Sequence, residues 1–137
     1  MSLRPVCDRL NEELEKAFNI KEFKVITDTY ECTIDYVRKD TYDEAIKKYW
    51  FVLRGSIWVN EKEHYTVGDV VVPLSKAESK AREIEELGCK LLPTTFGFTG
   101  EYTAVHKYKD YGVAHIHFEC KNITPESVRK LLRIMLE

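Results

Sequence analysis

The order in which β-rich and helix-like segments follow one another is the feature that most constrains the fold. Three β-rich stretches come before a helical segment near Ser75 and two come after it, and no helix lies between the strands of either run. Strands that arrive in runs favour an antiparallel sheet. We predict an α+β fold, an antiparallel sheet of about five strands with helices packed on one face, in the order α-β-β-β-α-β-β-α, as a single domain over residues 1–137.

The predicted elements follow from apolar periodicity, with a period near four for helices and near two for strands. The predicted helices cover about 5–18 and 75–88, and the last begins after Thr124. The predicted strands cover about 23–38, 46–59, 64–73, 101–109 and 112–120. Residues 90–100 contain a proline and two glycines, which predicts a connecting loop with room for a short strand.

Helix ends are marked by specific residues. Ser75 followed by Glu78 predicts a capping box, and Gly88 stands where a helix C-terminus favours a left-handed residue. Thr124 is the expected cap of the last helix, with Pro125 at its first position. The apolar stripes expected to face the core are Ala77, Ala81 and Ile84 in the middle helix, and Val128, Leu131, Leu132 and Met135 in the last one.

Charge and hydropathy exclude two classes of partner. Lys and Arg number 21 against 23 Asp and Glu, and the two signs alternate along the chain, so the basic patch that drives nucleic-acid binding is missing. No stretch approaches the roughly 20 apolar residues of a membrane span, and no signal core is present, so we expect a cytoplasmic protein. Glutamine is absent while Lys and Glu abound, which indicates a thermophilic source.

The four cysteines form no Cys-x-x-Cys pair, which argues against a zinc knuckle or a thioredoxin-type redox pair. They are Cys7, Cys32, Cys89 and Cys120, and we expect reduced, mostly buried thiols. Cys7 lies near Arg4 and Arg9 in the first turn of the first helix, which can lower a thiol pKa, but no positioned base is evident. Packing is the role we assign to it.

The last predicted hairpin holds three of the four histidines. A two-residue turn at Asp110 and Tyr111 would place His106 opposite His115, with His117 and Glu119 on the same face. Three imidazoles and a carboxylate could bind a divalent ion such as zinc or iron. Two alternatives stay open: a polar sheet surface without a ligand, and a dimer surface whose paired histidines respond to pH.

A second fragment resembles part of a cupin barrel. It runs from Val52 to Val59 and continues over residues 65–73, and a metal site of that family would draw on His115, His117 and Glu119. The sequence departs from the family because the histidine pair follows the Gly-Asp turn and a helix follows Pro73. We therefore explain Gly68-Asp69 as a turn that interrupts the strand 64–73.

An aromatic strand gives the other functional lead. Alternation over residues 49–59 makes both of its faces apolar, and helices on one side of a sheet can cover only one of them. The strand is either central and buried on both sides or part of a surface that binds a second copy or another protein. The residues assigned to such a partner surface are Trp50, Val52, Trp58, Tyr102 and Tyr108.

The order of elements resembles the fold of the type III secretion chaperones, and the general character of the sequence resembles uncharacterised proteins of heat-loving archaea. The resemblance extends over nearly the whole chain without a shared motif, and it implies a small homodimer that binds a partner. Our leading hypothesis is therefore a non-enzymatic, dimeric protein-binding or chaperone-like domain with no cofactor. The alternative is a metal-binding protein or metal-dependent enzyme that uses His106, His115, His117 and Glu119.

Overall fold

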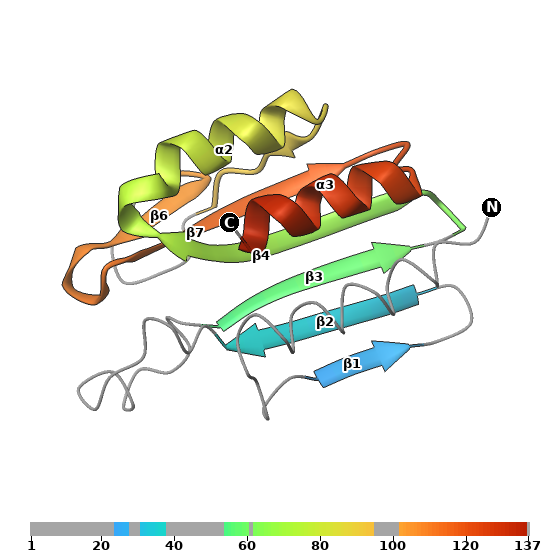
Figure 1. The fold of residues 1–137 in the computed structure, drawn as a ribbon, viewed down its shortest axis with the longest axis horizontal. Coiled ribbons are helices and arrows are strands. Elements are labelled where there is room, and N and C mark those ends of the chain that lie inside the picture. The colour runs from blue at the N-terminus through green and yellow to red at the C-terminus, as the bar shows by residue number, and fades with distance from the viewer. Residues whose placement is uncertain (1–23, 28–30, 38–53, 61, 95–101, 137) are drawn as a thin grey trace.

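The computed structural model describes residues 24–27, 31–37, 54–60, 62–94 and 102–136 (Figure 1). Its strands are β1 (Lys24–Thr27), β2 (Glu31–Val37), β3 (Arg54–Asn60), β4 (Tyr65–Pro73), β5 (Lys90–Leu91), β6 (Val105–Tyr108) and β7 (Val113–Cys120). Its helices are α2 (Ala77–Glu86) and α3 (Pro125–Leu136), with short 3-10 helices at Leu74–Lys76 (η3) and Lys109–Tyr111 (η4). The predicted helix over 5–18 lies outside the described residues.

The strands form one antiparallel sheet in the order β1-β2-β3-β4-β7-β5, and β6 pairs with β7 beside β5. Both described helices lie on the same side of this sheet, α2 against β7 and β5 and α3 against β4 (Figure 1). The predicted α+β class, the antiparallel sheet and the one-sided helix layer are confirmed. The strand count differs from five because the first β-rich segment is divided into β1 and β2, and because the predicted loop carries the short strand β5.

Helix α2 begins differently from the prediction. Strand β4 passes directly into η3, so Ser75 lies inside a 3-10 turn, and Lys76 takes the cap position without a side-chain hydrogen bond. The predicted capping box of Ser75 and Glu78 is therefore wrong. The C-terminal prediction is confirmed, since Gly88 has φ +88° and its N–H donates to the carbonyl of Glu85 at 2.9 Å.

Helix α3 begins as predicted. The hydroxyl of Thr124 accepts a hydrogen bond from the backbone N–H of Ser127 at 3.2 Å, which satisfies one of the free donors of the first turn. Val128 and Leu131 are buried as expected, and Ile134 continues their stripe, while the side chains of the predicted Leu132 and Met135 are not among those described. Within the described ranges, neither helix is long and apolar enough to cross a membrane.

The alternation of β4 and β7 divides the sheet into two faces. Under the helices lies the core, which Ile57, Val70, Val72, Ile116 and Phe118 form together with the buried residues of α2 and α3. The opposite face carries Asp69 and Val71 of β4 and the odd-numbered residues of β7. Val71 is fully buried there, so β4 is covered on both sides.

Close packing between β4 and β7 accounts for Gly68. Gly68 pairs with Phe118 across the two strands, and a Cβ at this glycine would lie 2.4 Å from Cζ of the Phe118 ring. Only a residue without a side chain allows the ring to lie flat on β4. The glycine is therefore a packing residue of a continuous strand, and the predicted turn at Gly68-Asp69 is wrong.

Gly68→Ala is expected to lower the free energy of unfolding by about 2 kcal/mol, because the added methyl group must displace a fully buried ring. Urea denaturation of the single variant measures this loss. In a Phe118→Leu background the same glycine substitution should cost less than half as much, since the tip of the ring is gone. Additive losses would contradict the close contact.

Candidate functional site

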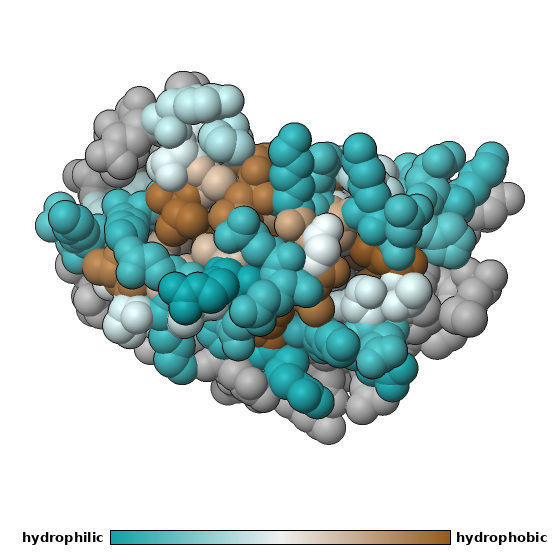
Figure 2. All heavy atoms as spheres, turned by 90° about the horizontal axis from the view of Figure 1, so that it is seen from above, coloured by the Kyte–Doolittle hydropathy of each residue, from teal (hydrophilic) through white to brown (hydrophobic). Residues whose placement is uncertain are grey.

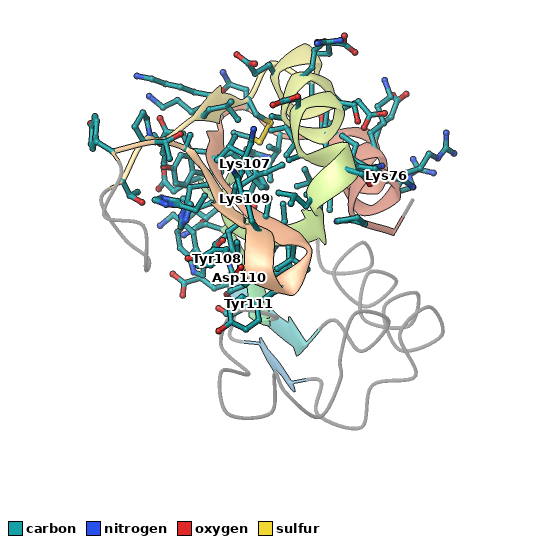
Figure 3. The ribbon with its side chains drawn as sticks, turned by 90° about the vertical axis from the view of Figure 1, so that its left-hand side faces the viewer. Lys76, Lys107, Tyr108, Lys109, Asp110 and Tyr111 are labelled. Atoms are coloured by element: carbon teal, nitrogen blue, oxygen red, sulfur yellow. A yellow bond between two sulfur atoms is a disulfide. The ribbon has the colours of Figure 1, made fainter. Side chains whose placement is uncertain are left out.

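The last hairpin has the predicted register but a different turn. His106 lies directly opposite His115, as expected. The two strands are joined by four residues instead of two, since η4 occupies Lys109–Tyr111 and Gly112 closes the turn at φ +69°. Figure 3 shows Asp110 and Tyr111 at the tip of this hairpin. Adding one residue on each side of the predicted turn leaves the pairing unchanged, which is why the faces were predicted correctly.

Asp69 joins the histidines. It pairs with His117 across β4 and β7. Its Oδ1 atom lies 3.0 Å from Nδ1 of His115 and 3.7 Å from Nε2 of His117. We refer to Asp69, His106, His115 and His117 as the Asp69 cluster.

His106 completes the cluster from strand β6. Its ring meets that of His117 edge to face, with the centroids 5.1 Å apart. Its Nε2 lies 2.9 Å from the hydroxyl oxygen of Thr94, a residue that is itself held by a β-bridge to Thr103. His106 is 0% exposed and His115 only 5%. The alternative of an exposed polar sheet surface is therefore wrong for these two histidines.

Burial and neighbouring charges set the protonation of the cluster. Burial lowers the pKa of His117, and the His106 and His115 imidazoles lower it further, while the Asp69 carboxylate acts in the opposite direction. Burial raises the pKa of Tyr108, and the Asp69 charge adds to this shift. Tyr108 packs on His115 with ring centroids 5.1 Å apart. The environment thus favours neutral His117 and neutral Tyr108.

Glu119, the carboxylate predicted from the sequence, lies apart from the ring contacts of the cluster. It accepts a hydrogen bond from the hydroxyl of Tyr65, and this bond raises the pKa of that tyrosine. Tyr65 in turn contacts Trp58, with ring centroids 5.9 Å apart. The carboxylate near the histidines is Asp69, which the sequence interpretation had assigned to a turn. The uninterrupted alternation of Tyr65, Val67, Asp69 and Val71 was the signal that could have found it.

The described ranges hold no group of three or more His, Cys, Asp and Glu side chains already arranged to hold a metal ion. Instead, Asp69 and His115 share a hydrogen bond. A metal ion would have to replace this hydrogen bond. The predicted set of His106, His115, His117 and Glu119 therefore brings its three histidines onto one face without forming a preassembled site.

The predicted partner surface is only partly described. Trp50 and Val52 lie outside the described residues. Trp58 is half-buried, and Tyr108 is only 8% exposed, so the ring of Tyr108 is not available for docking. Tyr102 is 72% exposed and is the one large hydrophobic side chain that stands out from the described surface. On the side of the molecule seen in Figure 2, hydrophilic residues cover most of the described surface and hydrophobic residues show between them.

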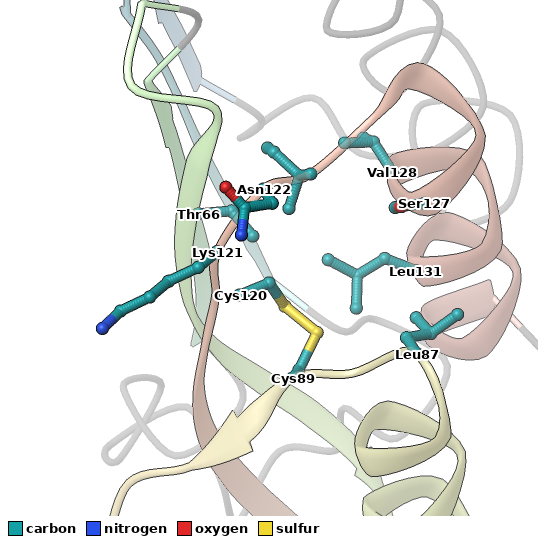
Figure 4. Close-up of a pocket in the computed structure, with 10 residues that line it drawn as sticks. Thr66, Leu87, Cys89, Cys120, Lys121, Asn122, Ser127, Val128 and Leu131 are labelled. Atoms are coloured by element: carbon teal, nitrogen blue, oxygen red, sulfur yellow. A yellow bond between two sulfur atoms is a disulfide. The ribbon is translucent and has the colours of Figure 1, made fainter.

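Two of the cysteines are joined. Cys89 and Cys120 form a disulfide between the segment after α2 and the end of β7, beside a pocket of roughly 40 Å³ under α3 (Figure 4). The expectation of reduced thiols is wrong for this pair, because the fold brings together residues 31 positions apart in the sequence. Such bonds are rare in the cytosol and common in secreted proteins and inside hyperthermophilic cells, so the cytoplasmic location and the thermophilic source both stay predictions.

No protein-family model, curated protein or solved structure matches this chain. The resemblance in element order to the secretion chaperones therefore stays a prediction. Any functional conclusion has to come from the residues of the site itself.

Acidification is expected to lower the free energy of unfolding through His117. Its pKa in the folded protein lies below the value of 6.5 in the unfolded chain, so between these two values the unfolded state binds more protons. The contribution of His117 to the free energy of unfolding is complete above pH 6.5 and declines as the pH falls below that value. Asp69, His106 and His115 face the same ring, so the informative comparison is between variants.

Urea denaturation at pH 7.5 and pH 5.5, in the presence of EDTA, measures this dependence. His117→Gln should show a smaller loss of stability between the two values than the unmodified protein. An equal loss in both proteins would contradict the assignment.

Proposed function

We propose that this chain is a metal-binding domain that holds a divalent transition-metal ion at the Asp69 cluster. One observation carries the proposal: a single carboxylate oxygen of Asp69 lies 3.0 Å and 3.7 Å from ring nitrogens of His115 and His117. Ligand atoms about 2.1 Å from one zinc ion lie roughly 3 to 4 Å from each other. Asp69 is therefore already at ligand spacing from both imidazoles.

The chemistry of the donors favours zinc or iron. Neutral imidazole nitrogens and carboxylate oxygens bind these ions, whereas magnesium and calcium favour an all-oxygen set. The lowered pKa of His117 supports the proposal, because only the neutral imidazole has a lone pair to donate. Asp69 would supply the negative charge that a dication needs in a partly buried place.

His106 has a supporting place in this proposal. Its edge-to-face contact with His117 puts a third imidazole next to the proposed ligands. The Thr94 hydroxyl on its Nε2 fixes the orientation of the ring. A hydrogen bond on one ring nitrogen orients the other nitrogen, as second-shell partners do in metal sites.

Cobalt substitution tests whether the imidazoles bind metal. Co²⁺ added to protein purified without a histidine tag should produce visible absorption bands, and one equivalent of Zn²⁺ should abolish them. His115→Ala should remove the bands, while Tyr65→Phe, which breaks only the contact to Glu119, should keep them. Cobalt spectra that stay those of the aqueous ion would contradict the proposal.

Binding of a protein partner is a second candidate, and the exposed Tyr102 favours it. Tyr102 precedes β6, which within the described part of the chain pairs with β7 along one edge only. Light scattering coupled to gel filtration tests the homodimer that this candidate requires. A monomer in both the natural chain and Tyr102→Ser would argue against Tyr102 as a contact between copies.

A further inference from the structure

The disulfide and the Asp69 cluster lie at the two ends of one short segment. Cys89 is bonded to Cys120, and the chain then pairs with β7 as strand β5. The N–H of Leu92 donates to the carbonyl of His117 at 2.9 Å, and two residues later Thr94 meets His106. Six residues thus connect the covalent bond with the ring of a cluster histidine.

Among the described residues, a short strand pairing and the packing of Leu91 on the core hold this segment against the sheet. Strand β5 has two residues, Lys90 and Leu91, and its pairing with β7 is extended only by the hydrogen bond of Leu92. The β-bridge between Thr94 and Thr103 fixes its far end. A two-residue strand contributes little by itself. The disulfide is the covalent anchor of the near end of this segment, which leads to Thr94.

We propose that the oxidation state of Cys89 and Cys120 regulates metal binding at the Asp69 cluster, through the position of Thr94 on His106. This inference rests on the proposed metal-binding function. A dithiol supplies two electrons and two protons, the Sγ–Sγ bond breaks, and two thiols form while the dithiol becomes a disulfide. The segment 89–94 then loses its covalent anchor, and Thr94 holds the His106 ring less firmly.

The direction of the effect follows from preorganisation. In the oxidised protein the His106 ring is held before metal arrives, whereas in the reduced protein the ring has to be ordered on binding. Loss of an outer partner of a ligand typically weakens metal binding by roughly 10- to 100-fold. We expect an effect near the lower end, about tenfold, because strand β5 still retains its hydrogen bonds.

The experiment compares zinc affinity with and without the disulfide. A Cys7→Ser/Cys32→Ser background removes the other two cysteines, so that neither of them competes for Zn²⁺. In this background, isothermal titration with ZnCl₂ compares the oxidised protein with Cys89→Ala/Cys120→Ala. The expected result is a Kd about tenfold weaker without the disulfide. A Kd within twofold of the oxidised protein would overturn the inference.

Two further variants separate this link from a general loss of stability. Thr94→Val keeps the disulfide and should weaken zinc binding by a similar factor, and it decides the question if the cysteine variant does not fold. Ile57→Val, in the core on β3, lowers stability at a place that β4 and β7 separate from the segment, and it should leave the Kd unchanged. Equal weakening by Ile57→Val would overturn the inference. Absence of zinc binding in the oxidised protein would instead overturn the proposed function.

Discussion

Asp69→Asn is expected to weaken zinc binding by more than about 100-fold, since loss of an outer partner alone costs roughly 10- to 100-fold. The substitution keeps the shape of the side chain and removes the carboxylate that lies beside His115 and His117. An amide oxygen binds zinc poorly, and the dication would then lie among neutral donors in a partly buried place. Isothermal titration of both proteins with ZnCl₂ measures the difference.

Glu119→Gln is the matched control for this prediction. Glu119 lies on the same face of β7 as His117, but its carboxylate is engaged by Tyr65. The control should bind zinc within about twofold of the unmodified protein, because the half-buried Glu119 carboxylate is already engaged by Tyr65. If Glu119→Gln abolished binding and Asp69→Asn did not, the site would be the one expected from the sequence alone.

Removal of the disulfide is expected to lower the free energy of unfolding by about 3 to 4 kcal/mol. The bond closes a loop across a sequence separation of 31, and the entropy of the unfolded chain rises by about 12 cal/mol/K when that loop opens. This is a large part of the roughly 5 to 15 kcal/mol that holds a domain together. Urea denaturation of Cys89→Ala/Cys120→Ala against the oxidised protein measures the loss.

Thiol titration provides the control. In the Cys7→Ser/Cys32→Ser background, the denatured and unreduced protein should show no free thiol, and the reduced protein should show two. Two thiols before reduction would mean that the bond does not form in solution. A variant as stable as the oxidised protein would contradict its structural role.

Local pattern was sufficient to predict most of the sheet. The alternation of Ala114, Ile116 and Phe118 with the histidines determined which face of β7 meets the helices. A turn centred on Asp110 and Tyr111 was sufficient to predict the register of the last hairpin, although the turn is longer than expected. Both are properties of neighbouring residues. The cap at Thr124 and the left-handed Gly88 are likewise local, and they were predicted correctly.

The errors have nonlocal causes. Gly68 has a local meaning as a turn residue, and its packing role depends on Phe118, which is 50 residues away in the sequence and opposite it in the sheet. Because the glycine was interpreted as a turn, Asp69 was assigned to the turn as well, and the carboxylate of the cluster was missed. The burial of His106 and the pairing of Cys89 with Cys120 also depend on segments that meet only in the folded chain.

The central claim is that the Asp69 cluster binds a divalent transition metal, and zinc titration tests it most directly. The measurement uses the oxidised chain without a histidine tag, freed of metal by a chelator and titrated with ZnCl₂ in a calorimeter. The account predicts about one equivalent bound with a Kd of about 1 μM or below, lost in Asp69→Asn and kept in Glu119→Gln. Less than about a tenth of an equivalent, or a Kd that is the same in all three proteins, would contradict it.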